Sequence, residues 1–76
     1  MSKQRVEHES PIDALIGVTK RLCRYEARYH LASEEFFHAF SQGEMEDSVD
    51  FVDWVNDYEN YMALRRDLEG SLRHAA

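Results

Sequence analysis

The histidine and acidic residues of this sequence could together bind a metal ion. Glu35 and His38 are three residues apart, a spacing that places both side chains on one face of a helix. Dinuclear carboxylate sites use this spacing, but they require two such pairs and two further glutamates from other helices. The sequence holds a single pair, and no HxxxH or CxxC motif accompanies it. We therefore predict no metal ion and no cofactor.

Two other arrangements could support catalysis. Asp50, Asp53 and Asp57 recur at helical spacing, and like charges this close raise a carboxyl pKa when they line a dry cleft. A chain of 76 residues has little room for such a cleft, so we interpret the three as a solvated acidic face. Cys23 falls in an apolar helical row, and we expect a buried thiol, because reactive thiolates need exposed, electropositive surroundings. No enzymatic activity is predicted.

A basic stripe lies in the first third of the chain. Its members are Lys20, Arg21, Arg24 and Arg28, three of which recur every four residues. Such a line could follow nucleic-acid phosphates, and a small nucleic-acid-associated regulator is the alternative function. Four charges make a small footprint on an otherwise acidic chain, so we expect the stripe to pair with acids of a later helix, within the chain or across a dimer.

Aromatic residues are concentrated in the middle of the chain. All nine lie between positions 25 and 61: Tyr25, Tyr29, Phe36, Phe37, Phe40, Phe51, Trp54, Tyr58 and Tyr61. One core of three helices uses about five, and Tyr and Trp are enriched at protein interfaces. The surplus favours a partner-binding surface, for a second copy or another protein. The alternative is that all nine fill one core, with tyrosine hydroxyls reaching solvent.

The net charge of −6 is unevenly distributed. Between Arg28 and Arg65 there are nine acidic residues and no Lys or Arg. A surface of that sign repels phosphate and suits either solvation or a basic protein partner. We therefore predict a non-catalytic interaction module that binds a basic partner protein or itself through an acidic, aromatic surface.

The elements that position these residues are helices, and we predict an all-α fold. Ser10 and Pro11 have the types expected at the start of a helix, which should span about residues 11–30. Ser33 is expected to cap a short helix over about 34–42, closed by Gly43. A further cap at positions 47–48 opens a helix over about 48–70, and the short connections predict that the two long helices are antiparallel. Gly17 is tolerable in the first helix if a neighbouring helix crosses closely there.

The length sets the domain organisation. We expect a flexible arm over residues 1–9 and a single helical domain over 10–76, a size at which the stability margin is thin and self-association helps. No apolar run is long enough for a membrane span or resembles a signal peptide, and a single cysteine gives no internal disulfide. A cytoplasmic location is expected.

The middle of the chain also resembles a known group of proteins. The pattern consists of Tyr25-Glu26, the SEEF segment 33–36, Gly43-Glu44, Asp47-Ser48, Asp50-Phe51 and Trp54. It resembles small, mostly uncharacterised bacterial and archaeal helical proteins, many of which look like antitoxins encoded beside a small toxin. The resemblance covers residues 25–66 and implies that the acidic, aromatic half occupies a basic toxin. One departure is His30, where a glycine closing the first helix is expected.

Overall fold

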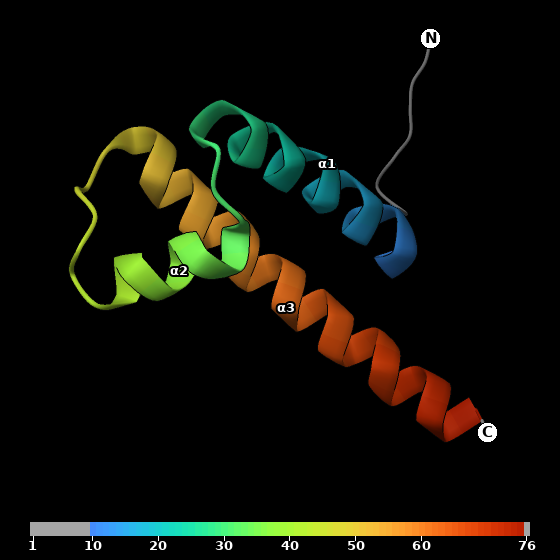
Figure 1. Ribbon diagram of the computed structural model, residues 1–76. Helices are drawn as coiled ribbons and strands as arrows, with labels where there is room; N and C mark the ends of the chain where they lie inside the picture. The colour runs from blue at the N-terminus through green and yellow to red at the C-terminus, as the bar shows by residue number, and fades with distance from the viewer. Residues whose placement is uncertain (1–9, 76) are drawn as a thin grey trace, which may run out of the picture.

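The computed structural model describes residues 10–75, which form three α-helices and no strand. Helix α1 spans Pro11–Tyr29, α2 spans Ser33–Ser41 and α3 spans Val49–Ala75 (Figure 1). The all-helical prediction is confirmed, and α3 continues past its predicted end at position 70. The predicted arm, residues 1–9, lies outside the described residues.

The sequence predicted how α1 begins but not how it ends. The Ser10 hydroxyl accepts a hydrogen bond from the Asp13 N–H at 3.1 Å, and Pro11 occupies the first helical position, as predicted. At the other end His30 adopts the left-handed conformation, with φ 55°, and its N–H donates to the Glu26 carbonyl. The turn expected of a glycine is therefore formed by histidine, in a region that non-glycine residues occupy at a cost.

The start of α2 differs from the prediction. Ala32, not Ser33, is the N-cap residue, and Ser33 is the first residue of the helix and is buried. The Ser33 N–H donates instead to the Glu26 carboxylate at 2.9 Å, so a side chain from α1 caps α2. The Ser33 hydroxyl is thereby free to accept from the Trp54 Nε1–H at 2.9 Å.

The turn between α2 and α3 follows the prediction more closely. Gly43 has φ 77°, the left-handed conformation expected of the residue that closes α2. The Ser48 hydroxyl accepts from the Phe51 N–H at 3.2 Å and caps α3, as predicted.

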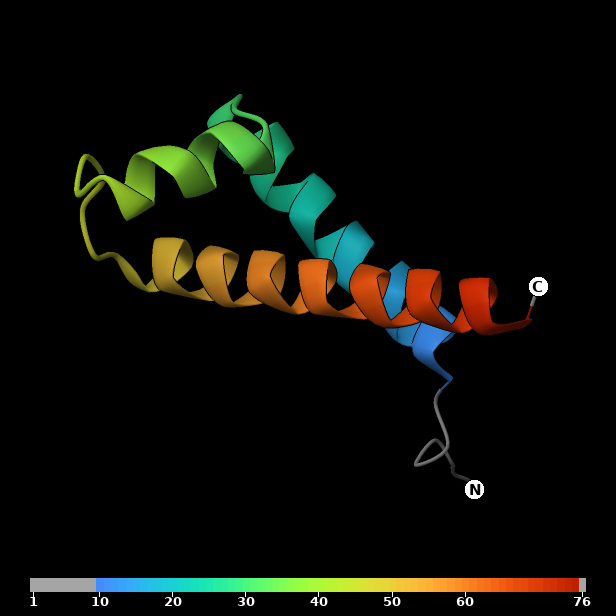
Figure 2. The same cartoon turned by 90° about the horizontal axis from the view of Figure 1, so that it is seen from below.

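All three helices contribute to one small aromatic core. Its buried members are Leu22 from α1, Phe36 from α2, and Phe51 and Trp54 from α3. The Phe36 and Trp54 rings stack with centroids 3.8 Å apart. Figures 1 and 2 show that α2 lies beside the first half of α3, while the second half of α3 extends away from α2. The core therefore gathers at the end of the molecule nearest the α2–α3 turn.

The contacts between α1 and α3 follow a regular order. Arg21 contacts Asp57, Tyr25 stacks on Trp54 with centroids 5.4 Å apart, and Arg28 contacts Asp50. Residues later in the sequence of α1 thus contact residues earlier in the sequence of α3.

The apolar residues of α1 lie on two faces of the helix. Val18 and Leu22 point inward and are buried, whereas Ile12 and Ile16 are 58% and 49% exposed. Cys23 lies on the exposed face with these isoleucines, so its predicted burial is wrong. The physical reason is that apolar spacing alone does not say which side of the helix α3 covers.

The condition given for a tolerable glycine at position 17, a closely crossing helix, is not met. A Cβ placed at Gly17 would approach only the Arg21 guanidinium, at 4.0 Å, and no neighbouring helix.

Candidate functional site

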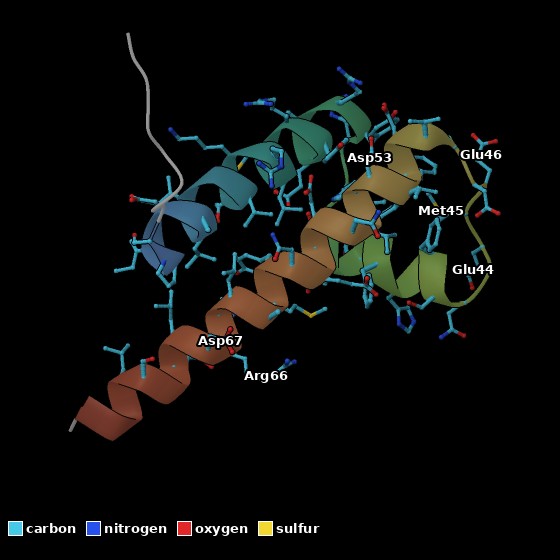
Figure 3. All side chains as sticks on the ribbon, turned by 180° about the vertical axis from the view of Figure 1, so that it is seen from behind. Glu44, Met45, Glu46, Asp53, Arg66 and Asp67 are labelled. Atoms are coloured by element: carbon cyan, nitrogen blue, oxygen red, sulfur yellow. The ribbon has the colours of Figure 1, made fainter. Side chains whose placement is uncertain are left out.

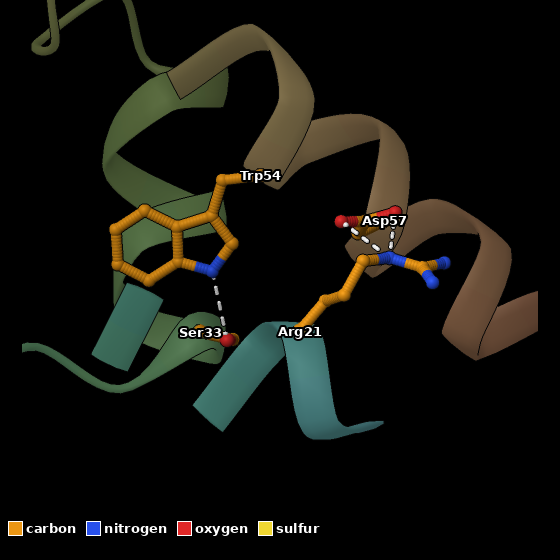
Figure 4. Close-up of polar contacts among 4 residues, drawn as sticks. All are labelled: Arg21, Ser33, Trp54 and Asp57. Carbon is orange, nitrogen blue, oxygen red and sulfur yellow. Dashed lines mark hydrogen bonds and ion pairs between the residues drawn. The ribbon is translucent and has the colours of Figure 1, made fainter. Parts of the chain in front are cut away.

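Two members of the basic stripe pair with α3. Arg21 Nε donates to both Asp57 carboxylate oxygens at 3.2 Å (Figure 4), and Arg28 Nη1 donates to Asp50 at 2.9 Å. Lys20 and Arg24 have no ion pair within the described part of the chain. The expected internal pairing thus holds for Arg21 and Arg28, and nucleic-acid binding would rest on two uncompensated cations.

Asp50 joins the end of α1 to the first turn of α3. Its Oδ2 accepts hydrogen bonds from the Tyr29 hydroxyl at 2.5 Å and from Arg28 at 2.9 Å. These two bonds, the tyrosine bond first, lower the pKa of the Asp50 carboxyl. The same bond to Asp50 raises the pKa of the Tyr29 phenol. The carboxylate is held ionised and hydrogen-bonded, which is suited to joining helices.

A shallow hollow of about 190 Å³ opens beside this junction. It is lined by Arg21, Arg24, Tyr25, Arg28 and Asp50. Burial, followed by the charge of Asp57, raises the pKa of Tyr25. Of its three arginines, Arg21 and Arg28 already pair with Asp57 and Asp50.

All nine aromatic side chains contact another aromatic ring within the chain. Phe36, Phe51 and Trp54 are buried in the core and are closed to any partner in this structure. The half-buried rings packed against that core are Tyr25, Tyr29, Phe40, Tyr58 and Tyr61. Phe37 packs on Tyr58 with centroids 5.0 Å apart. Use of the half-buried rings by a partner stays a prediction.

A second hollow, of about 100 Å³, lies among the three helices. Its lining consists of Thr19, Leu22, Cys23, Glu26, Ser33, Glu34, Tyr58 and Tyr61. Burial, followed by the charge of Glu34, raises the pKa of Tyr58. The hollow is acidic on one side and aromatic on another, and it is large enough for one side chain.

Most acidic residues of the central region have no ion pair with another side chain that the structure describes. Of the nine between Arg28 and Arg65, Asp50 and Asp57 are paired, and seven make no ion pair within the described part of the chain. These seven are exposed: Glu34, Glu35, Glu44, Glu46, Asp47, Asp53 and Glu59. We call them the acidic end. Figure 3 shows Glu44 and Glu46 on the α2–α3 turn, away from Arg66 and Asp67 on the far half of α3.

Two apolar residues within the acidic end were not part of the site predicted from the sequence. Val49 is 78% exposed and Val52 is 42% exposed. They belong to the first turn of α3, between Asp47 and Asp53. The sequence could have indicated their exposure. Phe51 and Trp54 mark the buried face of the helix, and helical geometry places Val49 and Val52 on the opposite side.

Within the side chains that the structure describes, no group of three His, Cys, Asp or Glu residues could hold a metal ion. None of the helices in the described range is long and apolar enough to cross a membrane. Compared with protein-family models, with curated proteins and with solved structures, the chain gives no match.

Proposed function

We propose that this protein is a non-catalytic interaction module, similar to an antitoxin, whose acidic end binds a basic partner protein. The observation that supports the proposal best is the group of seven exposed carboxylates without a counter-charge in the described part of the chain. Such a field attracts a cationic surface and accelerates its association. The resemblance of residues 25–66 to antitoxins indicates the class of partner, a small basic toxin.

Two exposed valines lie in the sequence among members of the acidic end. Val49 and Val52 are flanked by Glu46, Asp47 and Asp53. An apolar patch with a charged rim has the composition of a protein interface, in which the apolar groups provide burial and the rim provides steering. A solvated acidic face alone gives no reason for two exposed valines beside its carboxylates.

The proposal includes a rigid scaffold, an antiparallel pair formed by α1 and α3 and bridged by α2. Two ion pairs support this arrangement. Arg21, earlier in α1, contacts Asp57, whereas Arg28, later in α1, contacts Asp50, which comes earlier in α3. A preorganised scaffold reduces the conformational entropy lost on binding. Binding to a protein made in the same cell would take place in the cytoplasm.

Binding to the protein encoded by the adjacent gene tests this proposal. The two chains are co-expressed, purified, and mixed again in a calorimeter at low and high salt. We expect a complex that weakens with salt, and a loss of about tenfold or more in affinity for E44K/E46K and for V49D/V52D.

The control is D67K on the far half of α3, which makes the same charge change as the single substitution E44K, and E44K is measured beside it (Figure 3). D67K should bind like the unmodified protein. Absence of a complex, or equal losses for D67K and E44K, would contradict the proposal.

A further inference from the structure

The exposed face of α1 carries residues at the spacing used for helix pairing. Ile12, Ile16, Thr19 and Cys23 follow one another at intervals of four, three and four. This is the heptad pattern in which one helix packs against another. We call these four residues the outward seam.

Neither α2 nor α3 buries the outward seam, although its residues Thr19 and Cys23 also line the hollow that α1 shares with α2 and α3. Ile12 and Ile16 are 58% and 49% exposed, and Thr19 and Cys23 are also exposed. The Thr19 hydroxyl already donates to the Leu15 carbonyl at 2.7 Å. The seam can therefore be removed from water without leaving a polar side-chain atom unsatisfied.

One edge of the seam is charged. At about 100° per residue, Asp13, Lys20 and Arg24 all fall on the same side of the seam. All three are exposed, and none makes an ion pair within the described part of the chain. Asp13 is seven residues from Lys20, about 10 Å along the helix, so the two do not pair with each other.

We propose that the outward seam binds the outward seam of a second copy, with the two α1 helices antiparallel. In this register Ile12 faces Cys23 of the second copy, and Ile16 faces its Thr19. Antiparallel pairing brings identical edges together, so Asp13 of each copy lies beside Lys20 and Arg24 of the other. A parallel pair keeps Asp13 at one end and both cations at the other, and no such ion pairs form.

Among the described residues, this interface adjoins the acidic end only at Glu34, which lines one hollow together with Thr19 and Cys23. The seam occupies the first two thirds of α1, which Figure 1 shows away from the α2–α3 turn. A dimer can therefore form whether or not a partner occupies the carboxylates of the α2–α3 turn. The seam is short, so the interface falls at the small end of protein interfaces and the dimer is weak.

Disulfide trapping tests the register. In the antiparallel pair the two Cys23 residues are 11 positions apart along the helices, about 16 Å, which is beyond the roughly 7 Å that a disulfide spans. The unmodified protein should stay uncross-linked under mild oxidation, whereas I12C should form a covalent dimer through Cys23 of the second copy. I12C/C23S is the matched control and should form none.

Each other outcome of the trapping experiment overturns the proposal. A Cys23–Cys23 dimer of the unmodified protein would establish a parallel pair. Failure of I12C to cross-link at high protein concentration would exclude this seam as an interface.

Sedimentation equilibrium measures the same interface without cross-linking. We expect I16D to weaken the dimer about tenfold or more, and V49D, which changes a more exposed apolar residue outside the seam, to leave it unchanged. D13K should also weaken the dimer, and D13K/K20E/R24E should restore it because the charges exchange places. A monomer at all concentrations, or no difference between I16D and V49D, would overturn the proposal.

Discussion

Ser33 shows how one hydroxyl can be more important to the core than to its own helix. Its oxygen accepts from the Trp54 Nε1–H, and both side chains are buried. Water cannot replace this acceptor without entering the stack of Phe36 on Trp54. The bond fixes the indole at the point where α1, α2 and α3 meet (Figure 4).

We expect S33A to destabilise the protein by about 1–3 kcal/mol, because it leaves the buried indole N–H without an acceptor. Urea unfolding followed by circular dichroism measures this change. The matched control is S41A, an exposed serine in the same helix, which should change the free energy of unfolding by less than about 0.5 kcal/mol. Equal effects of the two substitutions would show that the hydrogen bond does not stabilise the core.

At the scale of the elements, α1 and α3 are joined by polar contacts on both sides of the aromatic core. Asp57 accepts from Arg21 at one position, and Asp50 accepts from Arg28 and Tyr29 two turns away. Surface ion pairs of this kind contribute little on their own, since water screens them. Their effect is to fix which residues of α1 lie opposite which residues of α3.

The Asp50 junction predicts a stability that depends on pH at both extremes. The pKa of Asp50 is lowered from 3.8, so its contribution is present above the ordinary carboxyl value and is lost as the pH falls through the lowered value. The pKa of Tyr29 is raised from 10.0, so its contribution is present below pH 10.0 and is lost as the pH rises through the raised value.

Thermal unfolding between pH 2 and pH 11 measures both limits. D50N should reduce the loss of thermal midpoint at low pH, called the acid limb. Y29F should reduce the loss of midpoint at high pH and leave most of the acid limb unchanged. D53N, which removes an exposed carboxylate outside the junction, serves as the control. An acid limb that D50N and D53N change equally would contradict this role of Asp50.

At the scale of the whole molecule, negative charge is concentrated at one end of the fold. The net charge is −6, and the seven carboxylates without an ion pair among the described side chains gather around α2, its turn and the first half of α3. Repulsion within this end opposes folding and favours a cationic partner. The ion pairs of Arg21 and Arg28 lie close by but use carboxylates outside this group.

We therefore expect added salt to raise the thermal midpoint, because it screens more repulsion than attraction. E44Q/E46Q should raise the free energy of unfolding at low salt by a few tenths of a kcal/mol, about 2 °C in midpoint. K20Q/R24Q, which removes unpaired cations instead, should lower the midpoint. A midpoint that falls with salt would mean that the ion pairs outweigh the repulsion.

Local chemistry allowed much of the fold to be predicted. Ser10 with Pro11, Gly43 and Ser48 mark helix ends through their own backbone preferences and their own hydroxyls, so the sequence announces them. The start of α2 was misplaced because Glu26, seven residues earlier in the chain, caps it. No local pattern signals a cap from another helix.

For the candidate site, the sequence by itself determined the acidic end, since nine acids without an intervening Lys or Arg form a negative region in any helical arrangement. Only the tertiary structure decided which residues face outward. It placed Phe36 and Trp54 in the core, and left Cys23, Ile16 and Val49 exposed. Helical spacing gives the stripes on each helix, but the direction from which a neighbouring helix packs decides which stripe is buried.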